Sequence, residues 1–90
     1  MPTNPTEPAP GESQEPRDLA EAYPLEQARL RALQVFCREQ AALAPTTNAG
    51  LRMYADAIIE PRLAEADRAA TSGDIVRIIQ AFAAMKEIQD

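Results

Sequence analysis

The spacing of apolar residues along this 90-residue chain predicts helices and no strands. From Pro24 to Leu43 the residues are good helix formers, and proline suits a first helical position because its missing N–H is not needed there. At about 100° per residue, one side of this helix carries Leu25, Leu33, Phe36 and Leu43, flanked by Ala28, Ala32, Val35, Leu30 and Cys37. The consistently polar positions form a narrow wedge of Gln27, Arg31, Gln34 and Arg38. So wide an apolar arc predicts that the helix is covered on more than one side.

A second helix is expected over residues 48–71. Pro45 ends the first helix, because the residue before a proline is pushed out of the helical region. Apolar residues then recur at helical spacing on both sides of Pro61. A proline inside a helix costs about 3 kcal/mol unless the helix bends there. We therefore predict one long helix that is kinked near Glu60.

The third helix has the clearest amphipathic pattern in the chain. Gly73 can take the left-handed conformation that ends a helix, and Asp74 is placed to cap the next one. The apolar stripe that follows consists of Ile75, Ile78, Ile79, Phe82 and Met85. Helices at about 24–43, 48–71 and 74–88 predict an all-α fold, a small antiparallel three-helix bundle over residues 19–90.

The first 18 residues differ from the rest in composition. They hold five prolines among small and polar residues, and Met1 is their one large apolar side chain. Such a segment cannot bury enough surface to offset the entropy of ordering its backbone, so we expect a disordered, acidic, Pro-rich tail over residues 1–18. It lacks the apolar middle of a secretion signal, and no apolar run approaches a membrane span. With a lone cysteine, Cys37, these features predict a cytoplasmic protein.

The net charge of −5 belongs mainly to the tail. Residues 1–24 carry five acidic side chains against one basic, whereas residues 25–90 carry nine against eight. The body is therefore nearly neutral. It does not offer the basic surface that nucleic acid or an anionic membrane would require, so we expect neither as a partner.

The residue types argue against an enzyme. The chain has no histidine and three glycines, which excludes histidine catalysis, the usual Cys/His zinc sites and Gly-rich phosphate loops. Cys37 lies mid-helix without an activating group, so we interpret it as a small buried hydrophobic residue. Asp56 and Glu60 stand four apart as in helical metal sites, yet without histidines a solvated charged face is the better interpretation. We expect no metal and no cofactor.

The stretch APTTNAGLR, residues 44–52, gathers polar groups at the start of the second helix. Free N–H groups and the positive end of the helix dipole favour an anion at such a place, and Thr46, Thr47, Asn48 and Arg52 would supply further donors. Thr and Asn are also the common caps of any interhelical turn. Capping is the preferred interpretation, and an anion site is the alternative.

The leading functional hypothesis is a non-enzymatic, small helical accessory protein that acts by protein–protein interaction, as a homo-oligomer. It depends on the missing catalytic groups, the small core and the wide apolar arc of the first helix. Leu30, Val35 and Cys37 flank the main apolar stripe of that helix, and they are the expected interface. The alternative function is binding or sequestering a small nucleotide-like anion at Thr46–Asn48, with help from Arg52.

Overall fold

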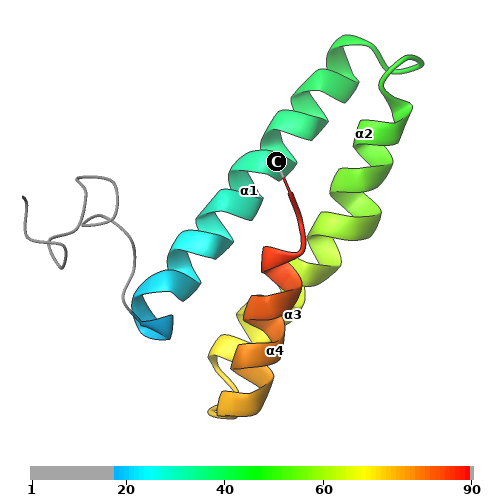
Figure 1. Cartoon of the computed structure of the whole chain (residues 1–90). Helices are drawn as coiled ribbons and strands as arrows, with labels where there is room; N and C mark the ends of the chain where they lie inside the picture. The colour runs from blue at the N-terminus through cyan, green and yellow to red at the C-terminus, as the bar shows by residue number, and fades with distance from the viewer. Residues whose placement is uncertain (1–17, 90) are drawn as a thin grey trace, which may run out of the picture.

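A computed structural model describes residues 18–89 of the chain, and those residues form helices joined by short turns (Figure 1). The elements are α1 (Leu19–Leu43), α2 (Ala49–Met53), the π-helical segment η2 (Tyr54–Ile59), α3 (Glu60–Ala70) and α4 (Ile75–Lys86). Because α2, η2 and α3 follow one another without a break, they make one long second helix. The prediction of a small all-α bundle is confirmed. Apart from Asp18, the predicted tail lies outside the described residues.

The second helix runs antiparallel to α1 as a long hairpin, and α4 folds back on the lower part of that hairpin (Figure 1). α4 contacts α1 and α3 but neither α2 nor η2. Within residues 18–89, the lower part is therefore a three-helix bundle, whereas the upper part consists of two helices alone. We call the upper part, which comprises α1 beyond Gln34 together with α2 and η2, the two-helix end.

α1 begins five residues earlier than expected and continues without a break through Pro24. The Asp18 carboxylate caps its first turn by accepting the N–H of Glu21 at 2.9 Å. Tyr23 is buried beside the proline, and its hydroxyl donates to the carbonyl of Ala66 in α3 at 2.8 Å. Placing Pro24 at the helix start was therefore wrong, because capping and burial of the first turns offset the single backbone bond that the proline removes.

The second helix passes Pro61 without interruption, as predicted. The irregularity expected near Glu60 takes the form of η2, the π-helical segment that directly precedes the proline. At its end the N–H of Glu60 bonds to the carbonyl of Ala55, five residues back. A short π-helical segment is one way in which a helix adjusts its hydrogen bonds next to a residue, such as proline, that cannot donate a backbone N–H.

The polar wedge of α1 faces the second helix. Gln34 is 6% exposed and its amide donates to the carbonyl of Ala55 at 3.1 Å. Beside it the Arg31 guanidinium bonds to both carboxylate oxygens of Asp67, each at 3.0 Å. One heptad further along, a similar ion pair joins Arg38 to Asp56 at 2.8 Å. We call this side of α1 the seam.

Buried residues of α1 lie along the seam: Tyr23, Leu30, Gln34, Cys37 and Ala41. The opposite side, which the sequence predicted to be core, is largely exposed: Leu25 is 55% exposed, Phe36 54% and Leu43 79%. That prediction was wrong in its choice of face. Arginine and glutamine can line a helix contact when their polar ends find partners at its edge or on a backbone carbonyl.

α4 is fixed at both of its ends. The Asp74 carboxylate accepts the N–H groups of Val76 and Arg77, and Gly73 has a φ of 73°, as predicted for this boundary. At the other end, Arg29 of α1 donates to the carbonyls of Met85 and Ile88, and Arg62 of α3 donates to that of Ala84. Two guanidinium groups thus bond to carbonyls at the end of α4, where backbone partners within the helix run out.

The core lies where all three helices meet. It contains Tyr23, Leu30, Ile59, Leu63, Ala66, Ala69, Ala81, Met85 and Ile88. Ile78 and Phe82 of the predicted α4 stripe pack against this core, but Ile75 and Ile79 do not belong to it, with 59% and 52% of their surface exposed. The stripe is therefore only partly buried, because α4 covers the hairpin with one edge of its apolar face.

Candidate interaction surface

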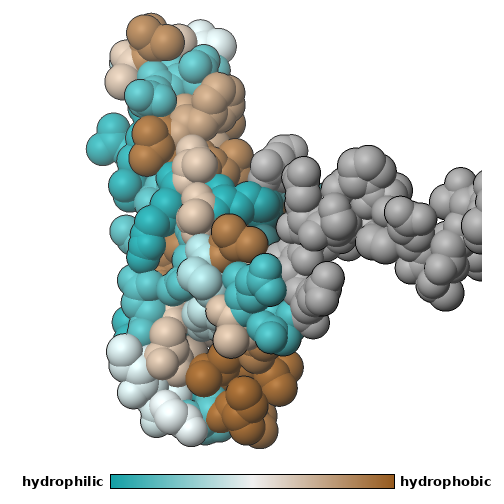
Figure 2. Space-filling model, turned by 90° about the vertical axis from the view of Figure 1, so that its left-hand side faces the viewer, coloured by the Kyte–Doolittle hydropathy of each residue, from teal (hydrophilic) through white to brown (hydrophobic). Residues whose placement is uncertain are grey.

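The outward side of α1 presents a line of residues that alternate four and three apart. We call this line the outward stripe, and it consists of Leu25, Arg29, Ala32, Phe36, Glu39 and Leu43. Ala32 and Glu39 are exposed like the three large apolar members, whereas Arg29 is half-buried against the end of α4. Figure 2, which views the molecule from the α1 side of Figure 1, shows hydrophobic residues at several levels of this surface.

A depression of about 380 Å³ lies within the outward stripe. Arg29, Ala32, Leu33 and Phe36 line it. These four residues are spaced i, i+3, i+4 and i+7, so the depression sits over the small side chain of Ala32 between two turns of the helix. The guanidinium of Arg29 donates to the carbonyls of Met85 and Ile88, at and just after the end of α4, at 3.0 and 2.8 Å, and to both carboxylate oxygens of Glu26 in α1 at 2.8 and 3.0 Å. The lower rim of the depression is therefore set by the bundle and not by α1 alone.

Two of the three residues predicted for the interface lie inside the protein. Leu30 is fully buried and Cys37 is 3% exposed, so neither contributes to an outer surface, and the prediction was wrong for both. They fall on the seam because the apolar arc of α1 extends onto it. Val35 is 52% exposed, beside the outward stripe. Burial also raises the pKa of the Cys37 thiol, as expected for a structural cysteine.

The polar turn before α2 does not gather its side chains around one point. Thr46 and Thr47 are exposed, and the Asn48 amide turns back to cap α1 by donating to the carbonyl of Gln40 at 2.9 Å. Asn48 therefore closes the first helix and makes no side-chain cap to the second. Arg52 bonds to Asp56 at 3.0 Å, one turn further from the helix start. The anion site remains a prediction for which these contacts supply no shared geometry.

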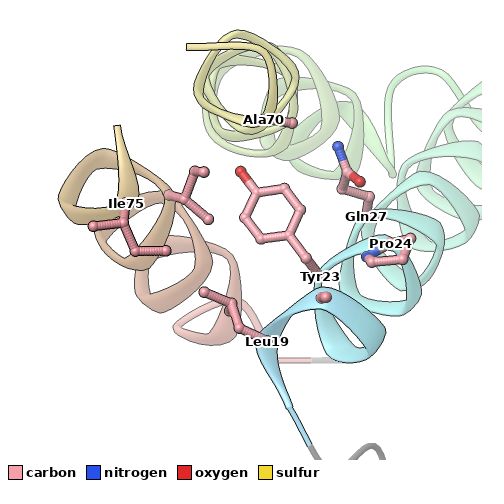
Figure 3. Close-up of a pocket in the computed structure, with 8 residues that line it drawn as sticks. Leu19, Tyr23, Pro24, Gln27, Ala70 and Ile75 are labelled. Carbon is pink, nitrogen blue, oxygen red and sulfur yellow. The ribbon is translucent and has the colours of Figure 1, made fainter. Parts of the chain in front are cut away.

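A second apolar surface lies at the start of α4, at the lower end of the molecule, where Figure 2 shows hydrophobic residues gathered. Ile75, Val76 and Ile79 are each more than half exposed there. Next to them is an open pocket of about 420 Å³ lined by Leu19, Ala20, Tyr23, Pro24, Gln27, Ala70, Ile75 and Ile78. In Figure 3 the ring of Tyr23 lies between Ala70 and Ile75, and its hydroxyl is already bonded to Ala66.

The acidic residues with shifted pKa values are engaged in ion pairs within the fold. Hydrogen bonds from Arg77 lower the pKa of Glu65 to about 2, with a smaller contribution from Arg68. Hydrogen bonds from Arg38 and Arg52 lower that of Asp56 in the same way. Carboxylates that are held ionised beside arginines stabilise the helix contacts and are poorly suited to donate a proton. Nowhere in residues 18–89 do three potential metal ligands cluster.

Neither the buried contact of Gln34 nor the depression at Ala32 was predicted from the sequence. One signal could have found the seam: Arg31 and Arg38 of the first helix face Asp67 and Asp56 of the second, in the reversed order that an antiparallel pair requires. The depression could not be found from periodicity, because it depends on where α4 ends.

No protein-family model, no curated protein and no solved structure matches this chain. In the part of the chain that the structure describes, none of the helices combines the length and the apolar character needed to cross a membrane.

Proposed function

We propose that this protein is a non-enzymatic, helical accessory protein that acts by binding protein, and that it self-associates through the outward stripe of α1. The observation that carries the proposal is the exposure of Leu25, Phe36 and Leu43 on a helix whose polar wedge is used inside the fold. Burying apolar surface contributes about 25 cal/mol per Å², and adjoining exposed apolar side chains in soluble proteins commonly mark interfaces.

The two-helix end supports the same proposal. All of the core cluster except Ile59, the last residue of η2, belongs to the three-helix part, and beyond Ile59 the buried apolar positions of the two-helix end are occupied by the small residues Cys37, Ala41 and Ala55. A helical hairpin of this kind buries little apolar surface by itself, and small domains without metals or disulfides are commonly stabilised by a partner. A partner helix against α1 supplies the missing layer.

The experiment is sedimentation equilibrium of the full chain over a hundredfold range of concentration, combined with thermal unfolding at the two ends of that range. We expect a reversible oligomer whose melting temperature rises with concentration, because association and folding are linked. Val35→Glu, which places a charge beside the outward stripe, should weaken the oligomer. A monomer throughout the range, with a melting temperature independent of concentration, would contradict self-association.

A further inference from the structure

We propose that the partner of the outward stripe is α1 of a second copy, packed antiparallel, with the twofold axis at the level of Gln34. This inference deepens the proposed function and rests on it. It assigns the occupant of the surface, its direction and its register, each of which follows from the order of residues along the stripe.

The residues of the outward stripe have the spacing of a coiled-coil interface. Its six members follow one another at intervals of four, three, four, three and four residues. The average of about 3.5 residues per turn keeps such a line facing a partner helix over its whole length. The stripe extends from Leu25 to Leu43, so that about five turns of α1 are available for contact.

An antiparallel pair in this register is complementary at each position. A twofold axis at Gln34 places Leu25 opposite Leu43 of the second copy, which pairs two exposed apolar side chains. It places Arg29, which is ion-paired with Glu26 at 2.8 Å within its own helix, opposite Glu39, so that the Glu39 carboxylate faces a basic side chain. It places Ala32 opposite Phe36, which pairs the smallest side chain of the stripe with the largest. The twofold axis repeats each pairing, so all six positions are satisfied by one register.

A parallel pair lacks this complementarity. In a symmetric parallel dimer each residue meets its own copy, so Arg29 would meet Arg29 and Glu39 would meet Glu39. Like charges placed opposite each other destabilise a helix contact. Ala32 would also meet Ala32 one turn from a pair of Phe36 rings, which leaves a gap beside a crowded layer. The order of charge and size along the stripe therefore favours the antiparallel direction.

The depression at Ala32 provides the socket for Phe36. In coiled coils a side chain of one helix inserts into a hole formed by four residues of the facing helix. Arg29, Ala32, Leu33 and Phe36 have the spacing of such a hole, and a depression of about 380 Å³ lies among them. The antiparallel register brings Phe36 of the second copy to Ala32, at the floor of that depression. Two Phe36 side chains and two sockets then lie on either side of the axis.

Cysteine cross-linking tests direction and register. Leu25→Cys and Leu43→Cys are prepared separately, oxidised alone and as an equal mixture, with the wild type as control because its Cys37 is buried. We expect disulfide-linked dimers in the mixture only. Positions 25 and 43 are 18 residues apart, about 27 Å at 1.5 Å per residue, so in the antiparallel pair like positions cannot react with each other. Cross-linking of Leu25→Cys alone would overturn the proposal in favour of a parallel pair.

Exchanging the small and the large residue tests the Ala32–Phe36 layer without introducing a charged or reactive side chain. Ala32→Phe and Phe36→Ala should each raise the dimer dissociation constant by at least about tenfold, a change of 1.4 kcal/mol. The double variant restores a large residue opposite a small one, and we expect it to recover to within about threefold of the wild type. Both positions are exposed, so far-UV circular dichroism should show unchanged helicity. A double variant as weak as the two single effects combined would contradict the register.

The results separate this inference from the proposed function. If the wild type sediments as a monomer at every concentration, self-association itself fails. If it dimerises but neither the mixed cysteine sample nor the double variant behaves as expected, self-association stands and the antiparallel α1 pair is overturned. Loss of dimer in Phe36→Ala with recovery in the double variant supports both.

Discussion

The two sides of α1 show that hydrophobicity alone does not decide which face of a helix is buried. The seam carries two arginines and two glutamines, yet it faces the second helix. The outward stripe carries two leucines and a phenylalanine, yet it faces solvent in the single chain. The seam is the side that packs against the second helix, because its polar side chains find hydrogen-bond partners across the contact and its buried residues pack into the interior. The stripe remains exposed, and we propose that a second copy covers it.

The ion pairs of the seam contribute specificity more than stability. Arg31, Asp67, Arg38 and Asp56 keep roughly half of their side-chain surface exposed, and exposed pairs contribute about 0 to 1 kcal/mol each. These ion pairs fix the register of the hairpin, since each joins one turn of α1 to one turn of the second helix. Stability then comes chiefly from the buried apolar residues between them.

The largest expected effect is on the buried side of α1. Leu30→Ala should lower the free energy of unfolding by about 2–5 kcal/mol, because it removes a fully buried side chain from the core cluster. Phe36→Ala on the outward stripe is the matched control, with an expected change within about 0.5 kcal/mol in dilute, monomeric protein. Urea unfolding measures both. Equal losses would mean that the two sides of α1 do not differ as described.

A smaller loss of stability is expected when the buried amide of Gln34 is removed from the seam. Gln34→Leu should cost about 1 kcal/mol, because the hydrogen bond to Ala55 is lost while that carbonyl keeps the N–H of Glu60. Gln27→Leu, which removes the more exposed hydrogen bond to Asp67, should cost less. A stabilised Gln34→Leu variant would show that the amide is not needed to set the seam.

The smallest effect concerns the carboxylate that joins α3 to α4. The folded pKa of Glu65 is about 2, below its ordinary value of 4.5, so its ion pair with Arg77 stabilises the fold above about pH 4.5. That contribution is lost as the pH falls toward 2. Melting temperatures of the wild type and Glu65→Gln should therefore differ modestly at pH 7 and converge near pH 2. Glu39→Gln, at a position without an ion pair to another of residues 18–89 of the same copy, is the control when all variants are measured in dilute, monomeric protein, and a constant difference for Glu65→Gln would contradict the account.

The sequence was sufficient to predict the helices and their turns, because Pro45, Gly73 and Asp74 act locally on the backbone. It did not identify the start of α1 at Leu19, since Tyr23 compensates for Pro24 only through its long-range contact with Ala66. The side of α1 that is buried was also missed. Periodicity reports where apolar residues gather, whereas the seam depends on partners that another helix brings into reach.

The anion site illustrates the same limit. Asn48 and Arg52 were correctly placed at the turn and the start of the second helix, but their side chains bond to Gln40 and Asp56. Residue type and spacing identify possible donors. Which acceptor each donor meets depends on the arrangement of the two helices.

The central claim is that the outward stripe of α1 is the interface, and sedimentation velocity of two charged variants tests it most directly. Phe36→Glu alters the stripe, and Ile79→Glu alters the second apolar surface, whose isoleucine is similarly exposed. At a concentration where the wild type is dimeric, we expect Phe36→Glu to sediment as a folded monomer and Ile79→Glu as a dimer. A dimeric Phe36→Glu beside a monomeric Ile79→Glu would contradict the claim and move the interface to α4.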